Sequence, residues 1–385
     1  MRECNSSLAT AEQQGTPLPG LGEGRGEGRS RNEYATLIDL YSDTKTKPTA
    51  GMRQAMANAE VGDSQKDEDP TVLRLQEMVA ELVGKEAALF LPSGTMCNQL
   101  ALKTHTNHGE TVIADRLSHV LISEGGGAGL LSGVMFQVLD GDRGRYTPEQ
   151  VEAAIQPGSR YQSKTTLLWA EQTNVYGGGV IWPLEQLQAV TAVAHEHGLK
   201  THLDGARLLN AVVATGVPAA EYAAGFDSTW ICLTKGLGCP VGAVLAGSVD
   251  FIAQARFYQH KIGGAMRQAG IIAAAGIYAL EHHIERLAED HANARQLAAG
   301  LAEIAGIEVL TPVPESNMVL FSVAGTGLSD AEFLGRLRER GVLMCPLLPG
   351  VIRAVCHLDV SSDDIDTALT AVEAVASESA RLAAS

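Results

Sequence analysis

The sequence lacks three patterns that would place it in other classes of protein. Its six cysteines show no Cys-x-x-Cys spacing, which argues against a zinc site and against a disulfide framework. No apolar run approaches the roughly 20 residues needed to cross a membrane. Basic clusters are missing, and the formal net charge of −16 argues against a nucleic-acid surface. We therefore expect a cytoplasmic protein with reduced thiols that binds no nucleic acid, membrane or metal.

Two common phosphate-binding motifs are also absent. The glycines at residues 125–129 break the Gly-x-Gly-x-x-Gly spacing of dinucleotide-binding proteins, and no Gly-x-x-x-x-Gly-Lys-Ser/Thr motif occurs. The sequence therefore argues against NAD or ATP as its ligand.

What is present indicates a globular α/β protein. The 385 residues, 45% apolar and 19% charged, are sufficient for two packed domains. Strand and helix patterns alternate up to about residue 246, which predicts a doubly wound domain with a mostly parallel sheet. Later residues change to long helices and a short mixed segment. We predict a disordered tail at residues 1–32, a large α/β domain with an N-terminal arm at 33–280, and a small α+β domain at 281–385.

Two ionisable residues each follow a short apolar run. Asp204 follows residues 199–203 and Lys235 lies just after residues 229–233, and both runs are typical of buried strands. Ligands bind at the carboxyl ends of parallel strands, so we expect both side chains at one edge of the sheet. This pair suits pyridoxal phosphate (PLP), because an amine forms a Schiff base with it and a carboxylate pairs with its pyridine nitrogen. An exposed loop lysine and a structural Asp204–Arg207 pair are the plainer interpretations.

Other residues could hold an anion. Ser-Gly-Thr at residues 93–95 lies between a strand and a helix, where backbone amides bind phosphate, although such residues are also common helix caps. Arg353 lies in an apolar run and could face solvent or bind a carboxylate. Arg267 could reach a phosphate or lie in a plain loop. His119 on its own is most simply a structural histidine.

Taken together, these segments resemble the low-specificity L-threonine aldolase family, fold-type-I PLP-dependent enzymes of the β-eliminating lyase superfamily. The similarity runs from about residue 39 to the carboxyl terminus. The resemblance implies the PLP-dependent transferase-like fold of aspartate aminotransferase, with a large domain around a mostly parallel sheet and a smaller α+β domain. The matching motifs are Asp-Leu-Tyr-Ser-Asp-Thr-Lys-Thr-Lys-Pro (39–48), Glu-Asp-Pro-Thr (68–71), Gly-Lys-Glu-Ala-Ala-Leu-Phe-Leu-Pro-Ser-Gly-Thr-Met (84–96), Leu-Asp-Gly-Ala-Arg (203–207), Thr-Lys-Gly-Leu (234–237) and Gly-Ala-Met-Arg-Gln-Ala-Gly (264–270).

The resemblance also implies a reaction and a set of roles. The reaction would be PLP-dependent cleavage of L-threonine, L-allo-threonine or a related β-hydroxy-α-amino acid to glycine and an aldehyde. The protein would be a homotetramer, a dimer of dimers with shared active sites. Lys235 would hold PLP covalently, Asp204 would pair with its pyridine nitrogen and His119 would stack on its ring. Gly94 and Thr95 would bind the phosphate, together with Arg267 from a neighbouring subunit. Ser42, Arg353 and Arg207, which also binds the cofactor, would hold the substrate carboxylate.

Two positions depart from the family's pattern. Lys66 stands where the family has a tyrosine before Glu-Asp-Pro-Thr, and Tyr161 aligns with a second histidine close to the β-hydroxyl. A phenol, whose ordinary pKa is about 10, is a poor base at neutral pH, so His119 acting through water is the expected proton acceptor. Both departures would lie on the substrate side, which leaves β-elimination or transamination of another amino acid open. A non-catalytic scaffold with a vestigial cofactor site is a third alternative.

Overall fold

The computed structural model describes residues 37–383, with side chains up to residue 378. The tail predicted at residues 1–32 lies outside the described residues. Residues from Ile38 onward form one compact unit. Among the described residues, no helix is both long and apolar enough to cross a lipid bilayer.

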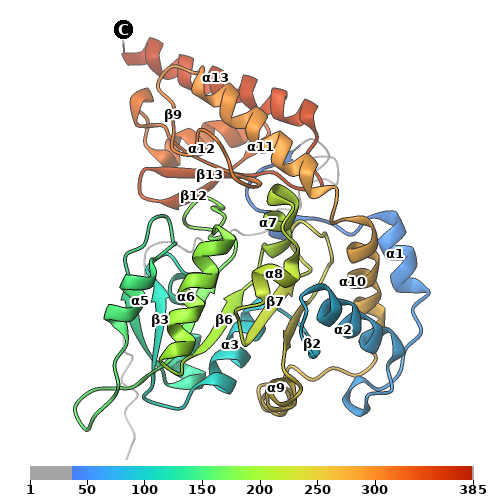
Figure 1. Cartoon of the computed structure of the whole chain (residues 1–385). Helices are drawn as coiled ribbons and strands as arrows, with labels where there is room; N and C mark the ends of the chain where they lie inside the picture. The colour runs from blue at the N-terminus through green and yellow to red at the C-terminus, as the bar shows by residue number, and fades with distance from the viewer. Residues whose placement is uncertain (1–36, 384–385) are drawn as a thin grey trace, which may run out of the picture. The chain divides into compact units, whose positions relative to one another are not determined.

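A seven-stranded sheet forms the centre of the larger part of this unit (Figure 1). The strand order is β2-β8-β7-β6-β5-β3-β4, and neighbouring strands are parallel except where β8 pairs with β2 and β7. The other six strands therefore all point in one direction. The strands are β2 (Ala87–Leu91), β3 (Thr111–Asp115), β4 (Met135–Leu139), β5 (Thr165–Glu171), β6 (Lys200–Asp204), β7 (Ser228–Cys232) and β8 (Ala243–Gly247).

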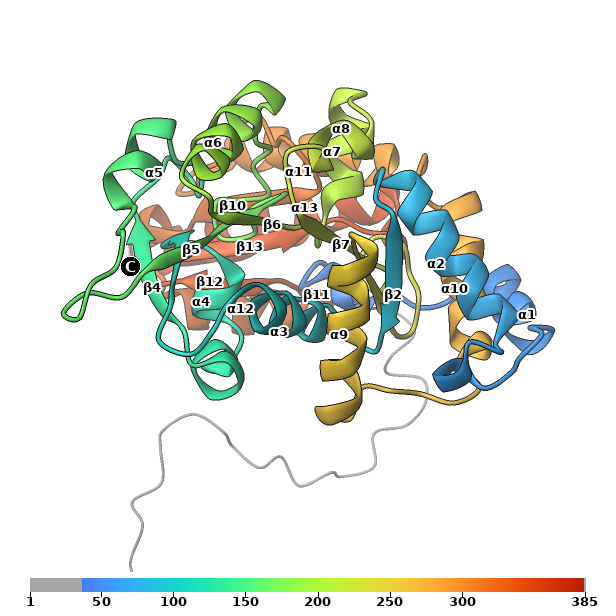
Figure 2. The ribbon, with the colours of Figure 1, turned by 60° about the horizontal axis from the view of Figure 1, so that its bottom comes forward.

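Helices cover both faces of this sheet, as Figure 2 shows. On one face lie α5 (Pro148–Ala154), α6 (Leu184–Glu196), α7 (Leu208–Thr215) and α8 (Ala219–Ala223). The other face packs against α3 (Gly94–His105) and α9 (Val249–Lys261). Towards the β2 edge, α2 (Pro70–Leu82) and α10 (Gly270–His282) pack together, and α1 (Ala50–Ala57) packs on α10. The short helix α4 (His119–Ile122) follows β3.

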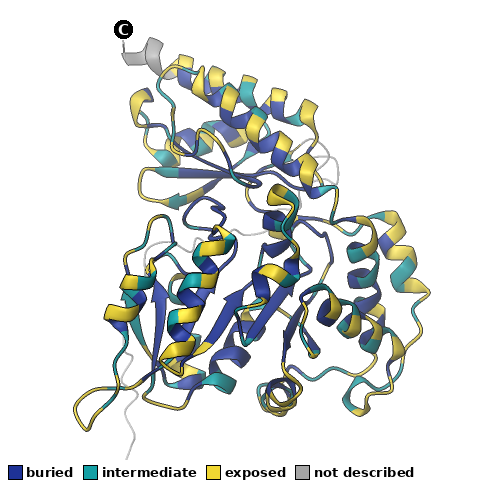
Figure 3. Ribbon diagram, viewed as in Figure 1, coloured by how far each residue is buried: buried dark blue, intermediate teal, exposed yellow. Residues whose placement is uncertain are grey.

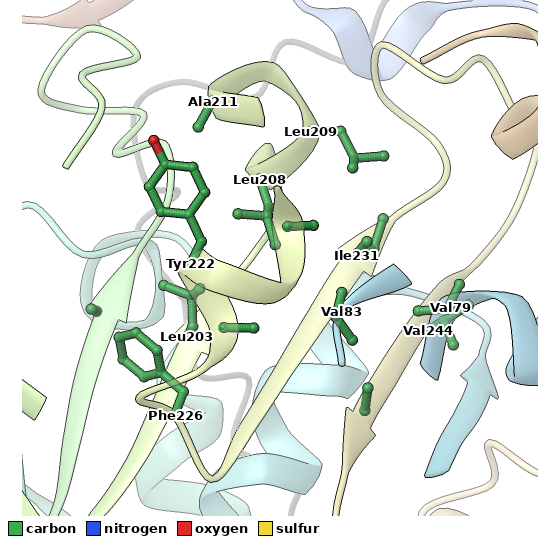
Figure 4. Close-up of a cluster of buried hydrophobic side chains, with 14 of the residues drawn as sticks. Val79, Val83, Leu203, Leu208, Leu209, Ala211, Tyr222, Phe226, Ile231 and Val244 are labelled. Carbon is green, nitrogen blue, oxygen red and sulfur yellow. The ribbon is translucent and has the colours of Figure 1, made fainter. Parts of the chain in front are cut away.

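The central strands are mostly apolar because neither face of the sheet is exposed to water. Every residue of β3, β7 and β8 is buried. Figure 4 shows the core on the α7 and α8 face, where Leu203 of β6 and Ile231 of β7 lie with Leu208 and Tyr222 of the covering helices. Burial is concentrated in the strands and on the inner sides of the helices (Figure 3).

A second, antiparallel sheet has a separate core. Its strand order is β12-β13-β10-β9, with bounds β9 (Glu308–Val309), β10 (Met318–Ser322), β12 (Cys345–Leu348) and β13 (Val351–Val355). The long helices α11 (Leu287–Ala302) and α13 (Ser362–Ala383) pack on each other, and α12 (Asp330–Glu339) lies beside α13. Residues 38–40 join this second core. Strand β1 (Ile38–Asp39) pairs in parallel with β11 (Val342–Leu343), and Leu40 is one of the buried apolar residues of the core. The domain boundary at residues 280 and 281 stays a prediction.

Candidate active site

The carboxyl ends of three neighbouring strands meet at one edge of the large sheet. Glu171 ends β5 and lies opposite Asp204, the last residue of β6, in the parallel ladder. Lys235 follows β7, the next strand in the sheet. The start of α3 at Gly94 lies at the same edge, because β2 runs in the same direction as these strands.

A cavity of about 230 Å³ lies at this edge. Three larger hollows, of about 460, 490 and 610 Å³, lie elsewhere and contain none of the predicted site residues. We assign the cavity of about 230 Å³ as the candidate active site because predicted site residues line it, although other hollows are larger. Six predicted residues line it: Gly94, Thr95, His119, Asp204, Arg207 and Lys235.

Asp204 is buried and held by neutral donors. Asn98 Nδ2 donates to its Oδ2 (2.8 Å), and the Ala206 N–H donates to its Oδ1 (3.0 Å). Burial raises the pKa of Asp204, while the charges of His119 and Lys235 oppose that rise. A protonated ring nitrogen would stabilise this carboxylate, since no ion pair joins it to a cation within residues 37–378.

His119 lies between two buried carboxylates. Its backbone N–H donates to Glu171 Oε2 (2.7 Å), and its ring Nδ1 lies 3.0 Å from Glu124 Oε1. Burial alone would lower the pKa of His119, but the hydrogen bond to Glu124 and the charges of Asp204, Glu171 and Glu124 outweigh it and raise that pKa. Burial, followed by the charge of Asp204, raises the pKa of Glu171 to about 7.

The first turn of α3 forms an anion cradle. Ser93 caps the helix, and its hydroxyl accepts a hydrogen bond from the Met96 N–H (3.2 Å). The amides of Gly94 and Thr95 donate to no acceptor in the described part of the chain. A Cβ at Gly94 would overlap the Trp230 ring, so only glycine keeps the helix start this close to the sheet. Together with the Asp204 carboxylate and the Lys235 amine, this donor set fits PLP.

The three residues expected to hold a substrate carboxylate lie in different settings. The Arg207 guanidinium is buried and bonds Asp43 through two nitrogens, Nε to Oδ2 (2.7 Å) and Nη2 to Oδ1 (2.6 Å). The neighbouring Ser42 hydroxyl accepts from the Thr44 N–H (3.2 Å) and does not line the cavity. Arg353 also lies outside the lining: its Nη2 donates to the Tyr41 carbonyl (3.2 Å), and its buried Nε has no partner in the described chain.

Three other predicted residues do not line this chain's own cavity. Lys66 lies in a turn that contacts the Arg267 segment, where the Ser64 N–H donates to the Arg267 carbonyl (3.1 Å). The Arg267 guanidinium pairs with Asp63 (2.8 Å).

Tyr161 does not line this chain's cavity. Its side chain is 82% exposed, and it precedes β5, at the amino end of a strand whose carboxyl end carries Glu171. The whole length of β5, about 3.3 Å per residue, therefore separates it from the cavity.

Sequence reasoning missed three buried polar residues that line the cavity: Asn98, Glu124 and Glu171. Two signals could have found them. Asn98 lies four residues after Gly94, on the same face of a helix. Glu171 ends an apolar strand in the same way as Asp204. Glu124 follows a short helix and carries no such signal.

The fold is that of a solved threonine aldolase and of an aspartate aminotransferase, the fold-type-I class predicted from the sequence. More narrowly, the chain belongs to the beta-eliminating lyase family, which matches residues 39–324. Within that family it belongs with the low-specificity L-threonine aldolases.

Known proteins support this assignment at high coverage. The chain is 41% identical over 343 residues to a probable low-specificity L-threonine aldolase 2 of Arabidopsis thaliana, covering 88% of this chain and 97% of that protein. It is 41% identical over 330 residues to the low specificity L-threonine aldolase of Escherichia coli (strain K12), covering 86% and 96%. The solved threonine aldolase of Leishmania major superposes with a TM-score of 0.76 at 21% identity, covering 88% and 99%, which shows the fold. The predicted family and fold class are confirmed.

Proposed function

We propose that the protein cleaves L-threonine, L-allo-threonine or a related β-hydroxy-α-amino acid to glycine and an aldehyde. The similarity to low-specificity L-threonine aldolases over most of both chains supports this reaction. The observation that carries the proposal is the cavity in which Lys235, Asp204 and the first turn of α3 meet.

The chain's own residues would hold PLP at four points. Lys235 would bind it covalently, Asp204 would pair with its pyridine nitrogen, and His119 would lie against its ring. The amides of Gly94 and Thr95 would bind its phosphate, joined by Arg267 from a neighbouring subunit. Bound PLP would supply an electron sink for the negative charge left on Cα when the Cα–Cβ bond breaks.

The substrate carboxylate would be fixed by arginine. Arg207 lines the cavity, and its remaining nitrogen, Nη1, is the available donor. Arg353, whose Nη2 bonds the Tyr41 carbonyl, and the Ser42 hydroxyl, on the arm that carries Asp43, would assist. Holding the carboxylate orients the bond to be broken, which lowers the entropic part of the barrier. His119 would then accept the β-hydroxyl proton through water, and a proton returned to Cα would complete glycine.

We also propose a cytoplasmic homotetramer, a dimer of dimers with shared sites. Lys66 and Arg267 lie off this chain's cavity, so a neighbouring subunit would have to bring them to a site. The exposed side chains of Leu130 and Met135 would be covered in such an assembly. The five described cysteines are free and buried, as expected in a reducing compartment.

One assay tests the proposed reaction. Purified protein loaded with PLP is offered a panel of L- and D-β-hydroxy-α-amino acids, and aldehyde and glycine are measured. We expect both products in equal amounts from at least one L-isomer. Absence of both from the whole panel would overturn the proposal. The same samples are assayed for pyruvate and ammonia, which would instead indicate β-elimination. No observation favours that alternative, because relatives matched over most of both chains are named L-threonine aldolases.

A further inference from the structure

A fully buried carboxylate that has no role so far contacts the ring of His119. The Glu124 side chain has 0% exposure, whereas the side chain of His119 is 37% exposed and lines the cavity. Burying a carboxylate is costly unless its oxygens accept hydrogen bonds, so its partners indicate what it does.

Three donors converge on Glu124. Its Oε1 accepts from Asn98 Nδ2 (2.6 Å) and lies 3.0 Å from His119 Nδ1, and its Oε2 accepts from Gln99 Nε2 (2.8 Å). Gln99 turns its amide towards the carboxylate although its own Oε1 is left without a partner. Both carboxylate oxygens therefore act only as acceptors, as an ionised group does.

This arrangement determines which nitrogen of His119 carries the proton. A carboxylate accepts, so Nδ1 must donate, and a neutral imidazole then has its lone pair on Nε2. Within residues 37–378, no protein group forms a hydrogen bond with Nε2. The free lone pair belongs to a ring that lines the cavity.

Resting on the proposed function, we propose that Glu124 is a positioning residue: it fixes His119 in the Nδ1–H tautomer, leaving Nε2 as the proton acceptor of the site. It also stabilises the positive charge that His119 gains when it takes a proton.

Asn98 connects this pair to the cofactor side of the cavity. The same Nδ2 that donates to Glu124 also donates to Asp204 Oδ2 (2.8 Å), and Asn98 Oδ1 accepts from Trp230 Nε1 (2.7 Å). Every polar atom of the Asn98 side chain is thus used. Glu124, which orients His119, and Asp204, on the cofactor side, therefore share one hydrogen-bond donor, Asn98.

Glu124→Gln is the variant that tests the proposal with least disturbance. Glutamine keeps Oε1, which still accepts from Asn98 and His119, and loses only the charge. Its new amide group would face Gln99, whose amide can flip to offer the unpartnered Oε1. The matched control is Glu152→Gln, which removes the charge from an exposed glutamate 2.9 Å from His197 Nε2.

In the holoenzyme we expect E124Q to lower kcat about 10- to 100-fold, by analogy with the loss when a carboxylate that supports a metal-binding histidine is removed, with little change in KM. E152Q should match the wild type. In a His119→Asn background, E124Q should add almost no further loss, because the base on which it acts is already gone. Full additivity, or unchanged kcat in E124Q, would overturn the proposal.

A second readout does not depend on turnover. Diethyl pyrocarbonate modifies neutral imidazole, so the pH dependence of His119 modification, followed by mass spectrometry of its peptide in cofactor-free protein, reports its protonation. The groups that raise the pKa of His119 are Glu124, Asp204 from β6 and Glu171 from β5, and Lys235 lines the same cavity. We expect the midpoint to move to lower pH in E124Q and to stay unchanged in E152Q.

The two proposals fail in different ways. If no substrate yields an aldehyde, the proposed reaction is wrong whatever the modification experiment gives. If the wild type releases an aldehyde but the His119 midpoint is the same in E124Q, the assignment of Glu124 is wrong and the proposed function stands.

Discussion

Lys235 and Asp204 reach one cavity because each lies at or just past the carboxyl end of adjacent parallel strands, β7 and β6. A site for covalently bound PLP and the carboxylate that pairs with its ring could therefore be predicted from two short motifs. The buried partners Asn98 and Glu124 could not be identified as partners in the same way, because their contact depends on how α3 lies on the sheet.

Lys235→Ala removes the amine expected to bind PLP. We expect loss of the visible absorbance of the bound cofactor and loss of aldehyde release, with an unchanged far-ultraviolet circular dichroism spectrum. The control is Lys261→Ala, at the end of α9, which should keep both colour and activity. An intact visible spectrum in K235A would contradict the assignment.

Glu171 is expected to make stability depend on pH. Burial raises the pKa of Glu171 to about 7, above its unfolded value of 4.5, so the folded state binds more protons between those values. Stability of the cofactor-free protein should therefore fall as pH rises through this window, by about 1 to 3 kcal/mol. Urea unfolding of wild type and Glu171→Gln from pH 5 to 7.5 checks this. An equal slope in both proteins would contradict it.

At the scale of elements, the start of α3 combines a cap, a close approach and an anion site. The strand, turn and helix were predictable here because Ser93, a helix-capping residue, and Gly94 lie between an apolar run and a helical segment. The requirement for glycine at position 94 was not predictable, because it arises from the close approach of the Trp230 ring of β7, which is distant in the sequence.

Gly94→Ala should disturb this element directly. A methyl group would push the first turn of α3 away from Trp230, so the amides that bind phosphate would shift. We expect PLP affinity to fall at least about 10-fold, equivalent to 1.4 kcal/mol, in a titration of apoenzyme followed by absorbance. Gly335→Ala, where the added methyl group meets nothing within 4 Å, is the control and should leave PLP affinity unchanged. Equal affinities in G94A and wild type would show that the cradle is elsewhere.

At the scale of the compact unit from Ile38 onward, Asp43 connects the two sheets. It forms the double ion pair with Arg207, which follows β6, and accepts from Asn317 Nδ2 (3.3 Å) beside β10. The predicted succession of an α/β pattern and a smaller mixed segment agrees with the two cores. The sequence did not indicate that residues 38–40 join the second core, because a two-residue parallel strand has no recognisable pattern.

Asp43→Asn should destabilise the whole unit strongly. It leaves the buried guanidinium of Arg207 without a counter-charge, which typically costs about 3 to 5 kcal/mol. The matched control is Asp142→Asn, which breaks the pair between Arg145 and an aspartate that is 76% exposed and should change stability by less than about 1 kcal/mol. Urea unfolding at fixed protein concentration measures both. Similar losses in the two variants would contradict a special role for the buried pair.

The parallel pairing of β1 with β11 has a consequence for the order of events during synthesis. The arm that carries Ser42 and Asp43 leaves the ribosome early, whereas its partner strand at Val342–Leu343 is among the last segments translated. The arm therefore lacks this strand partner until translation is nearly complete, although Arg207, which pairs with Asp43, is translated earlier. A nascent chain released before residue 343 would contain every strand of the large sheet, yet it would lack the strand with which β1 pairs.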